Sequence, residues 1–296
     1  MSASTSHTPI ERARPLLGTR VDIKVSGLPE AEAQQAIDAG FAAIAEIHGL
    51  MSFHEAASDV SALNRDAAHR AVAVNPHTFD VIRRGLALAA ASCGVFDMTV
   101  AAQLVSWGFL PRPEGSPDPD LLGSASDIEL LSEDRVRFHR PLWIDLGGIA
   151  KGYAVDRAVE KIHAMGALQC CVNAGGDLRV AGPLSERVLL RTDAPGDTVP
   201  VVEIENGSLA SSSGREHLKH YESREVGPHL HGVQRLTVGT QTFVSVVAEE
   251  CVWADALTKV VLARGAEAES VLRAYGATAY LQSVSGSWRV IGGETL

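Results

Sequence analysis

The sequence predicts an α+β fold, a single domain whose mixed or antiparallel sheet has helices inserted at irregular intervals. Several strand-like segments follow one another directly, whereas a doubly wound parallel sheet alternates strand and helix. The 296 residues are 46% hydrophobic, and no Ser/Gly-rich or Pro-rich linker divides them. We therefore expect residues 1–14 to be a flexible N-terminus and residues 15–296 to form one domain.

The N-terminal elements have clear local signals. Residues 20–25 alternate apolar and polar side chains, which is typical of a strand. Residues 29–51 begin with a proline, carry acidic residues in the first turn and repeat apolar residues every three or four positions, which indicates a helix. A second helix is expected from the cap Asn75 to Gly94, because glycine tolerates the left-handed conformation that ends a helix.

Strands dominate the second half. A third helix is expected from Ile149 to Gly166 and a fourth from Val252 to Arg264, closed by Gly265. A polar segment, residues 211–239, interrupts the strands. We expect these strands at residues 128–131, 135–139, 168–173, 178–180, 188–192, 199–205, 242–248, 277–284 and 287–291.

Charge and composition exclude several classes of protein. Lys and Arg total 26 against 36 Asp and Glu, giving a net charge of −10. A nucleic-acid binder needs the opposite excess to neutralise phosphates. The most apolar stretches, residues 81–93 and 252–263, are too short and too charged to span a bilayer, and no apolar signal segment begins the chain. We expect a cytoplasmic protein without nucleic-acid partner or membrane anchor.

The four cysteines lie within apolar segments. In such surroundings a free thiol behaves as a small hydrophobic side chain. We therefore expect Cys93, Cys170, Cys171 and Cys251 to be reduced and buried.

Residues 145–152 join a strand to a helix start. Their glycines allow backbone N–H groups to approach an anion at the positive end of the helix. The segment is no Walker motif, because Lys151 precedes Gly152 and no Ser or Thr follows in the required place. Two interpretations stay open here, an anion site and a turn that lets helix and strand pack closely.

Other polar segments also allow two interpretations. Gly175 and Gly176 form a second Gly-Gly turn, and residues 208–214 form a hydroxyl-rich loop that can hold phosphate or merely be solvated. A zinc site has to be considered because the polar segment contains four histidines, which are His217, His220, His229 and His231. No Cys or carboxylate spacing completes a recognised zinc-binding pattern with them. Asp255 precedes Lys259 by four residues, so its simplest role is an ion pair near the start of a helix.

Taken together and in order, these segments resemble the FAD:protein FMN transferases of the ApbE-like family from Leu17 to Gly265. The order of the motifs is more specific than any one of them. Residues 145–156 (DLGGIAKGYAVD) are almost the family consensus. The other matching segments are residues 17–19, 52–64, 94–100, 107–109, 172–177, 211–214 and 254–257.

The resemblance implies transfer of the FMN half of FAD to a Thr or Ser hydroxyl of a target flavoprotein, with release of AMP. In such phosphoryl-type transfer a cation, here Mg²⁺, neutralises the diphosphate. By position, the mechanistic histidine corresponds to His229, a plausible proton acceptor. The cation ligands correspond to Gly148, Asp255 and Thr258. The flavin and adenine contacts correspond to Leu17, His54, Val95, Phe96, Asp97, Asp145 and Lys151.

Two segments depart from the family pattern. The Asp-Pro that follows the family histidine is missing after His229, which leaves His231 as an alternative imidazole. The metal-binding Thr expected four residues after Asp255 is replaced by Lys259, with Thr258 one position earlier. Either Thr258 reaches the cation from a distorted helix, or the Lys259 ammonium replaces Mg²⁺.

These departures keep two other functions open. One is an FAD-binding carrier or sensor that has lost transfer activity, and the other is an FAD pyrophosphatase in which water replaces the acceptor hydroxyl. Because the net charge of −10 does not favour a diphosphate, binding must depend on local groups. We expect the Gly147 and Gly148 amides, Lys151 and either a cation at Asp255 or Lys259 to supply it.

Overall fold

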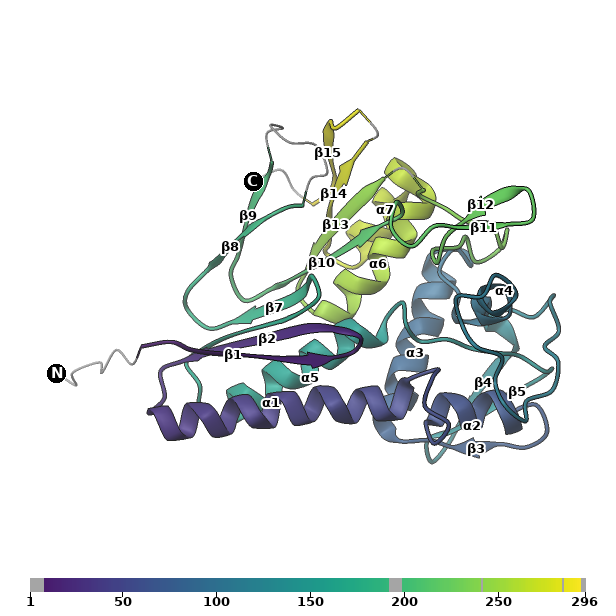
Figure 1. Cartoon of the computed structure of the whole chain (residues 1–296), viewed down its shortest axis with the longest axis horizontal. Helices are drawn as coiled ribbons and strands as arrows, with labels where there is room; N and C mark the ends of the chain where they lie inside the picture. The colour runs from purple at the N-terminus through teal and green to yellow at the C-terminus, as the bar shows by residue number, and fades with distance from the viewer. Residues whose placement is uncertain (1–7, 192–198, 241, 284, 294–296) are drawn as a thin grey trace.

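A large antiparallel sheet organises the molecule (Figure 1). The computed structural model describes residues 8–191, 199–240, 242–283 and 285–293. The sheet has eight strands in the order β1-β2-β6-β7-β10-β13-β14-β15, and every neighbouring pair is antiparallel, which confirms the predicted α+β class. Its strands are β1 (Ile10–Leu16), β2 (Thr19–Ser26), β6 (Gln169–Ala174), β7 (Asp177–Ala181), β10 (Ser208–Ser213), β13 (Phe243–Ala248), β14 (Thr278–Gln282) and β15 (Trp288–Gly292).

Three helices pack on this sheet and on one another. Helix α1 (Glu30–Met51) contacts α5 (Ala150–Ala164), and α5 contacts α6 (Cys251–Arg264), which lies against β10 and β13. Helix α1 buries one face at three- and four-residue spacing, as predicted. Helix α6 is buried almost all round, which is typical of a helix in the centre of a domain. The polar side chains of α6 are therefore held inside the protein.

A second group of elements lies at the C-terminal end of α1 (Figure 1). It contains α2 (Asp59–Asp66), α3 (Pro76–Ala91), α4 (Ala101–Ser106) and a sheet of β3 (Val72–Ala73), β5 (Arg135–Phe138) and β4 (Ile128–Leu131). Buried Asn64 joins this group to the segment before Asp145. Its Nδ2 donates to the Ile144 carbonyl at 3.1 Å, and its Oδ1 accepts from the Ile144 N–H at 2.8 Å.

The remaining elements are smaller. The strands β8 (Glu186–Leu189) and β9 (Val201–Ile204) form a hairpin. Its apolar side chains and those of β7 and β10 form a cluster separate from the main core. The segment predicted as polar, residues 211–239, contains the hairpin β11 (Lys219–Tyr221) and β12 (Arg224–Val226). Helix α7 (Glu269–Ala274) follows α6, and short 3₁₀ turns are found at Met98–Val100, Ala125–Asp127 and Gly265–Ala268.

Two sequence predictions differ from the structure, and others fall partly outside the described residues. The domain boundary expected at residue 15 is too late, because Ile10–Leu16 forms β1, which pairs with β2. This edge strand is exposed at most positions and so lacks the apolar alternation of a half-buried strand. The hydroxyl-rich run 208–214 is strand β10 and not a loop, with Ser208 and Ser212 buried. Residues 1–7, Thr192 and Val284, which belonged to predicted segments, lie outside the described residues.

The prediction for Cys93 is also wrong. Its side chain is exposed, because α3 ends at Ala91 and the next residues turn away with φ values of 53° at Cys93 and 78° at Gly94. Cys170 and Cys251 are buried and Cys171 is partly buried, and all four thiols are free. No helix of the described ranges is long and apolar enough to cross a membrane.

Candidate functional site

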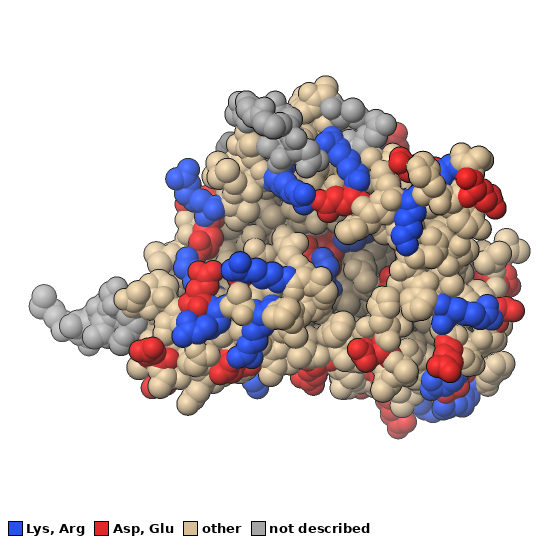
Figure 2. Space-filling model, viewed as in Figure 1, with Lys and Arg blue, Asp and Glu red and all other residues tan. Residues whose placement is uncertain are grey.

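Two adjoining cavities form one cleft beside the start of α5. The large cavity, about 520 Å³, is lined by the segment after α3, by His229 and by Lys259. The small cavity, about 230 Å³, is lined by residues from the β1–β2 turn, from the end of α1 and from α5. Asp145 and Gly147 line both cavities, so the two lie on either side of the same segment. In Figure 2 a hollow with both signs of charge lies near the middle of the face, and basic and acidic side chains are interspersed around it.

The cleft gathers every residue predicted to contact flavin or adenine. Val95, Phe96 and Asp97 line the large cavity. Leu17, His54 and Lys151 line the small one, and Asp145 faces both. Of the residues expected to bind the cation, Gly148 lines the large cavity, whereas Asp255 and Thr258 are completely buried behind it.

The glycines of residues 145–152 have different roles. A Cβ at Gly152 would lie 2.2 Å from the carbonyl oxygen of Cys251, so this glycine is required for α5 and α6 to pack. A Cβ at Gly148 would meet Phe96 and Lys259 at ordinary distances of 3.6 and 3.7 Å. Gly152 therefore serves close packing of two helices, α5 and α6, instead of the helix–strand packing that was expected, while Gly148 leaves the cavity surface open to a ligand.

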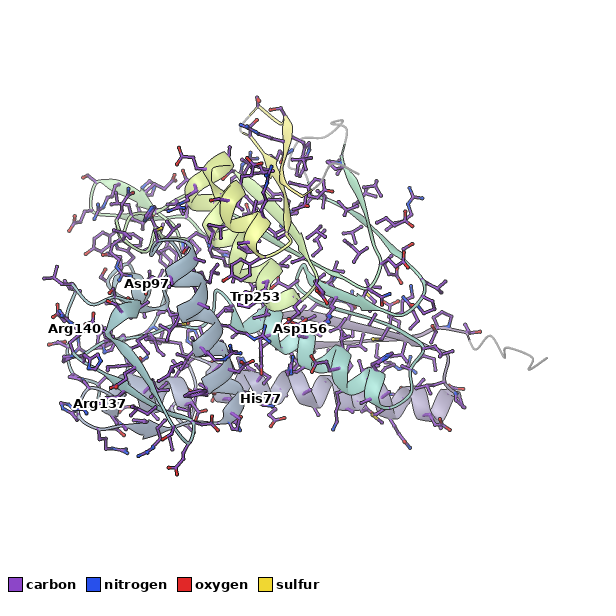
Figure 3. All side chains as sticks on the ribbon, turned by 180° about the vertical axis from the view of Figure 1, so that it is seen from behind. His77, Asp97, Arg137, Arg140, Asp156 and Trp253 are labelled. Atoms are coloured by element: carbon purple, nitrogen blue, oxygen red, sulfur yellow. The ribbon has the colours of Figure 1, made fainter. Side chains whose placement is uncertain are left out.

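Asp156 fixes the start of α6 against α5. Its carboxylate accepts hydrogen bonds from the backbone N–H groups of Cys251 at 2.9 Å and Val252 at 2.8 Å, and it pairs with Arg179 at 2.7 Å. Figure 3 shows Asp156 on α5 close to the first turn of α6, which carries Trp253. A carboxylate at the positive end of a helix stabilises that end. The last residue of the 145–156 motif thus determines where Asp255, one turn further along α6, is placed.

A lysine–aspartate pair lies on the small-cavity side. Lys151 Nζ lies 2.5 Å from Asp177 Oδ2, and Asp177 is only 1% exposed. Burial, followed by repulsion from Asp255, raises the pKa of Asp177 to about 6. Burial lowers the pKa of Lys151, but attraction by Asp177 and Asp255 outweighs it, so the net shift is upward.

A second pair lies on the large-cavity side. Lys259 Nζ makes a close ion pair with Asp255 Oδ1, and the other carboxylate oxygen, Oδ2, accepts from the Gly152 N–H at 3.0 Å. Burial opposes ionisation of Asp255, but Lys259, Lys151 and the Gly152 hydrogen bond together lower its pKa. Asp255 is therefore held as a carboxylate between α5 and α6.

The groups expected to bind magnesium do not fit a bare divalent ion. Both carboxylate oxygens of Asp255 are engaged, and Thr258 Oγ1 donates to the Asp255 carbonyl at 2.7 Å and contacts Ser212 Oγ at 2.8 Å. Mg²⁺ requires a near-octahedral shell of oxygen ligands, whereas an ammonium stands among these oxygens. Within the described ranges, no cluster of three or more His, Cys, Asp or Glu side chains is placed to bind a metal, zinc included.

His229 lines the large cavity beside Lys259. Burial, followed by repulsion from Lys259, lowers the pKa of His229 to about 3, so the imidazole is neutral at physiological pH. His231 is not among the cavity-lining residues, and its Nδ1 accepts from the N–H groups of Val233 at 3.2 Å and Gln234 at 3.3 Å. The geometry therefore favours His229 over His231 as the imidazole of the site.

The altered loop after His229 is attached to the segment that carries Asp97. Arg235 Nη2 donates to Asp97 Oδ2 at 3.1 Å, to Thr99 Oγ1 at 2.8 Å and to the Gly123 carbonyl at 2.8 Å. Gly232 N–H donates to the Val95 carbonyl at 2.9 Å. Burial raises the pKa of Asp97, and attraction by Arg235 partly offsets this. Arg235 thus holds the loop in place without the Asp-Pro expected after the histidine.

Several residues of the site were missed from the sequence. Asp177 and Ser212 were interpreted as parts of a turn and a loop, although each is buried next to a lysine of the cleft. Asp177 begins strand β7 next to the buried Leu178, which was a usable signal because a buried carboxylate requires a partner. Leu110 and Pro228 also line the cleft, but they carry no sequence signal of it.

Comparison with known proteins gives a consistent result. Residues 17–281 match the model of the ApbE family. The chain is 26% identical over 273 residues to an FAD:protein FMN transferase of Vibrio cholerae, covering 86% of this chain and 80% of that one. It is 29% identical over 213 residues to a Rhodobacter capsulatus protein of the same name. That match covers 67% of this chain but only 40% of the relative.

Solved structures share the fold. The ApbE protein of Thermotoga maritima superposes with a TM-score of 0.83 at 25% identity, covering 95% of this chain and 96% of that one. The Pseudomonas stutzeri flavinyl transferase ApbE superposes with a TM-score of 0.79 at 19% identity, covering 99% and 97%.

Proposed function

Because the chain belongs to the ApbE family, we propose that it is an FAD:protein FMN transferase. Its substrate is FAD, and its partner is a flavoprotein that offers a Thr or Ser hydroxyl. The observation that carries the proposal is the convergence of Lys151, Lys259 and neutral His229 on one cleft. Two ammonium groups and an unprotonated imidazole are the groups that transfer from a diphosphate to a hydroxyl requires.

In the proposed reaction the acceptor hydroxyl oxygen attacks the phosphorus on the FMN side of the diphosphate. A new P–O bond joins FMN to the acceptor, and the bond from that phosphorus to the bridging oxygen breaks. AMP leaves with the bridging oxygen, and the hydroxyl proton passes to His229. The anionic diphosphate raises the pKa of the neighbouring imidazole, which makes His229 a better base once FAD is bound.

The rest of the cleft binds and orients the substrate. Phe96 and Leu17 offer apolar surface to the ring systems. The Gly147 N–H donates to Asp145 Oδ1 at 3.1 Å, so Gly148, which lines the large cavity just before α5, is the glycine whose N–H is proposed to bind the anionic part of the ligand. Magnesium is expected from the resemblance, but no step is assigned to it, because Asp255 and Thr258 are engaged as described above.

Transfer is tested by incubating the protein with FAD and a candidate acceptor flavoprotein, in EDTA and in magnesium. AMP is measured in solution and covalent flavin by its fluorescence on a denaturing gel. We expect both products from the wild type, a loss of both in His229→Gln, and retention in the matched control His231→Gln. AMP and FMN without a labelled acceptor would indicate the pyrophosphatase, and bound FAD without either product would indicate a carrier.

We also propose that the protein works in the cytoplasm. Its four cysteines are free, which suits a reducing compartment. The test is fractionation of cells that express the full chain at its natural level.

A further inference from the structure

The ammonium of Lys259 lies in a cage of oxygen atoms at the wall of the large cavity. Nζ contacts Asp255 Oδ1 closely, the Asp255 main-chain carbonyl at 3.1 Å and Ser212 Oγ at 3.4 Å. These oxygens come from α6 and β10. The Lys259 side chain is 17% exposed, and it lines the cavity beside Gly148 and His229.

The cage itself is fixed by further hydrogen bonds. Asp255 accepts from the Gly152 N–H of α5 at 3.0 Å. Ser212 contacts Thr258 Oγ1 at 2.8 Å, and Thr258 in turn donates to the Asp255 carbonyl at 2.7 Å. Asp255 and Thr258 are 0% exposed and Ser212 is 9% exposed. The position of the positive charge is thus determined before any ligand arrives, which is the condition for strong electrostatic binding.

The cage also accounts for how an acidic protein can bind a diphosphate. The net charge of −10 produces a field that repels polyanions. The Asp255 carboxylate offsets the charge of Lys259 at a distance. At short range, in a cavity wall where the effective dielectric constant is below that of water, the ammonium still attracts a phosphate oxygen that contacts it directly. A divalent ion can enter the cage only after Lys259 leaves it, since the ammonium already binds the carboxylate and carbonyl oxygens that the ion would need.

We infer that Lys259 is a built-in cation: its ammonium exchanges its longest cage contact, the one to Ser212 Oγ at 3.4 Å, for an oxygen of the FAD diphosphate, in the position where a metal ion would otherwise be required. This inference rests on the proposed function only in taking FAD as the ligand. It makes FAD binding independent of divalent ions, and it assigns Ser212 and Thr258 to positioning the ammonium.

The test measures the dissociation constant of FAD for the full-length protein, by quenching of flavin fluorescence, in EDTA and in magnesium. We expect the wild type to give the same value in both. Lys259→Thr removes the charge and adds a hydroxyl to the remaining oxygens of the cage. It should bind FAD about tenfold more weakly in EDTA and regain affinity in magnesium.

Two variants serve as controls. Lys161→Thr makes the same charge change at an exposed site of α5, and should behave as the wild type in both buffers. Lys259→Arg keeps the charge and should bind FAD in EDTA more tightly than Lys259→Thr. A direct titration with Mn²⁺, which needs no FAD, should show a site in Lys259→Thr that the wild type lacks.

Several outcomes would overturn the inference: a wild type that loses FAD affinity in EDTA, a Lys259→Thr variant as tight as the wild type in EDTA, or no FAD binding in either buffer. Metal-independent FAD binding without transfer would leave the inference standing and overturn the proposed function. AMP release and FAD binding that both require magnesium would overturn the inference and leave the proposed function standing.

Discussion

The cleft contains two lysine–aspartate pairs of the same chemistry whose surroundings differ. Lys259 and Asp255 are four residues apart on α6, and Asp255 has a second donor in the Gly152 N–H. Lys151 and Asp177 join α5 to β7, and the Lys151 side chain is 33% exposed against 17% for Lys259. The pKa of Asp255 is lowered, whereas that of Asp177 is raised to about 6.

The difference follows from the number of donors that each carboxylate receives. Both carboxylates are desolvated, but Asp255 is held by an ammonium and a backbone N–H, whereas repulsion from Asp255 acts on Asp177. Lys259 is consequently a fixed charge. Lys151, which is bound less firmly and more exposed, is better able to turn toward a ligand that enters the small cavity.

Removing Asp255 should have the largest effect. In Asp255→Ala the Lys259 ammonium and the Gly152 N–H lose their shared partner, and breaking a buried pair in this way costs about 3–5 kcal/mol. Urea unfolding followed by circular dichroism measures the loss. Asp38→Ala, which removes an exposed carboxylate paired with Arg14, is the control and should change the free energy of unfolding by less than about 1 kcal/mol. An equal loss of unfolding free energy in the two variants would mean that the buried pair contributes no more to stability than the exposed one.

Asp177→Asn should cost less, about 1–3 kcal/mol, and the cost should depend on pH. The folded pKa of Asp177, about 6, lies above its ordinary value of 3.8. The folded protein therefore binds an extra proton between these values, and wild-type stability falls as pH rises through that window. Asparagine does not titrate, so the cost of the substitution should be larger at pH 4.5 than at pH 7. A cost that grows with pH would contradict the raised pKa.

Lys151→Met should weaken FAD binding about tenfold, which corresponds to about 1.4 kcal/mol. Since the ammonium interacts with phosphate, the affinity for riboflavin, which has no phosphate, should stay the same. Both dissociation constants can be measured by fluorescence, with Lys161→Met as the matched control. Equal weakening for the two ligands would show that Lys151 contributes through packing instead of charge.

The smallest expected effect is on the titration of His229. Repulsion from Lys259 contributes more than repulsion from Lys151 to the pKa of about 3. Lys259→Met should therefore raise the His229 pKa further than Lys151→Met. Nuclear magnetic resonance of ¹⁵N-labelled histidine measures it, with His229→Gln to assign the signal. A larger rise of the His229 pKa in Lys151→Met than in Lys259→Met would show that His229 interacts more strongly with the Lys151–Asp177 pair.

Local signals in the sequence predicted most of the fold, because caps, glycines and apolar periodicity determine where helices begin and end. They placed α1, α3, α5 and α6 to within a few residues. They missed β1 because an exposed edge strand has no alternating pattern. They missed β10 because its buried residues are Ser208, Ala210 and Ser212 with a single large apolar side chain, Leu209.

Most of the positions predicted for the site line one cleft, but the contacts among them follow from no sequence pattern. The order of motifs brought Asp145, Lys151 and His229 into one cleft. No sequence pattern could show that Lys259 Nζ lies among the Asp255 and Ser212 oxygens, since this depends on β10 packing against α6. Nor could it show that Arg235 holds the loop that carries His229, because that bond joins residues 138 positions apart.

The junction between α5 and α6 also constrains the order of assembly during synthesis. The bonds from Cys251 and Val252 to Asp156, and from Gly152 to Asp255, join residues 95, 96 and 103 positions apart. A nascent chain that has left the ribosome as far as β13 already contains the glycine turn and Lys151, but it lacks the helix that supplies the second ammonium. Flavin capture during translation would therefore report the docking of α6.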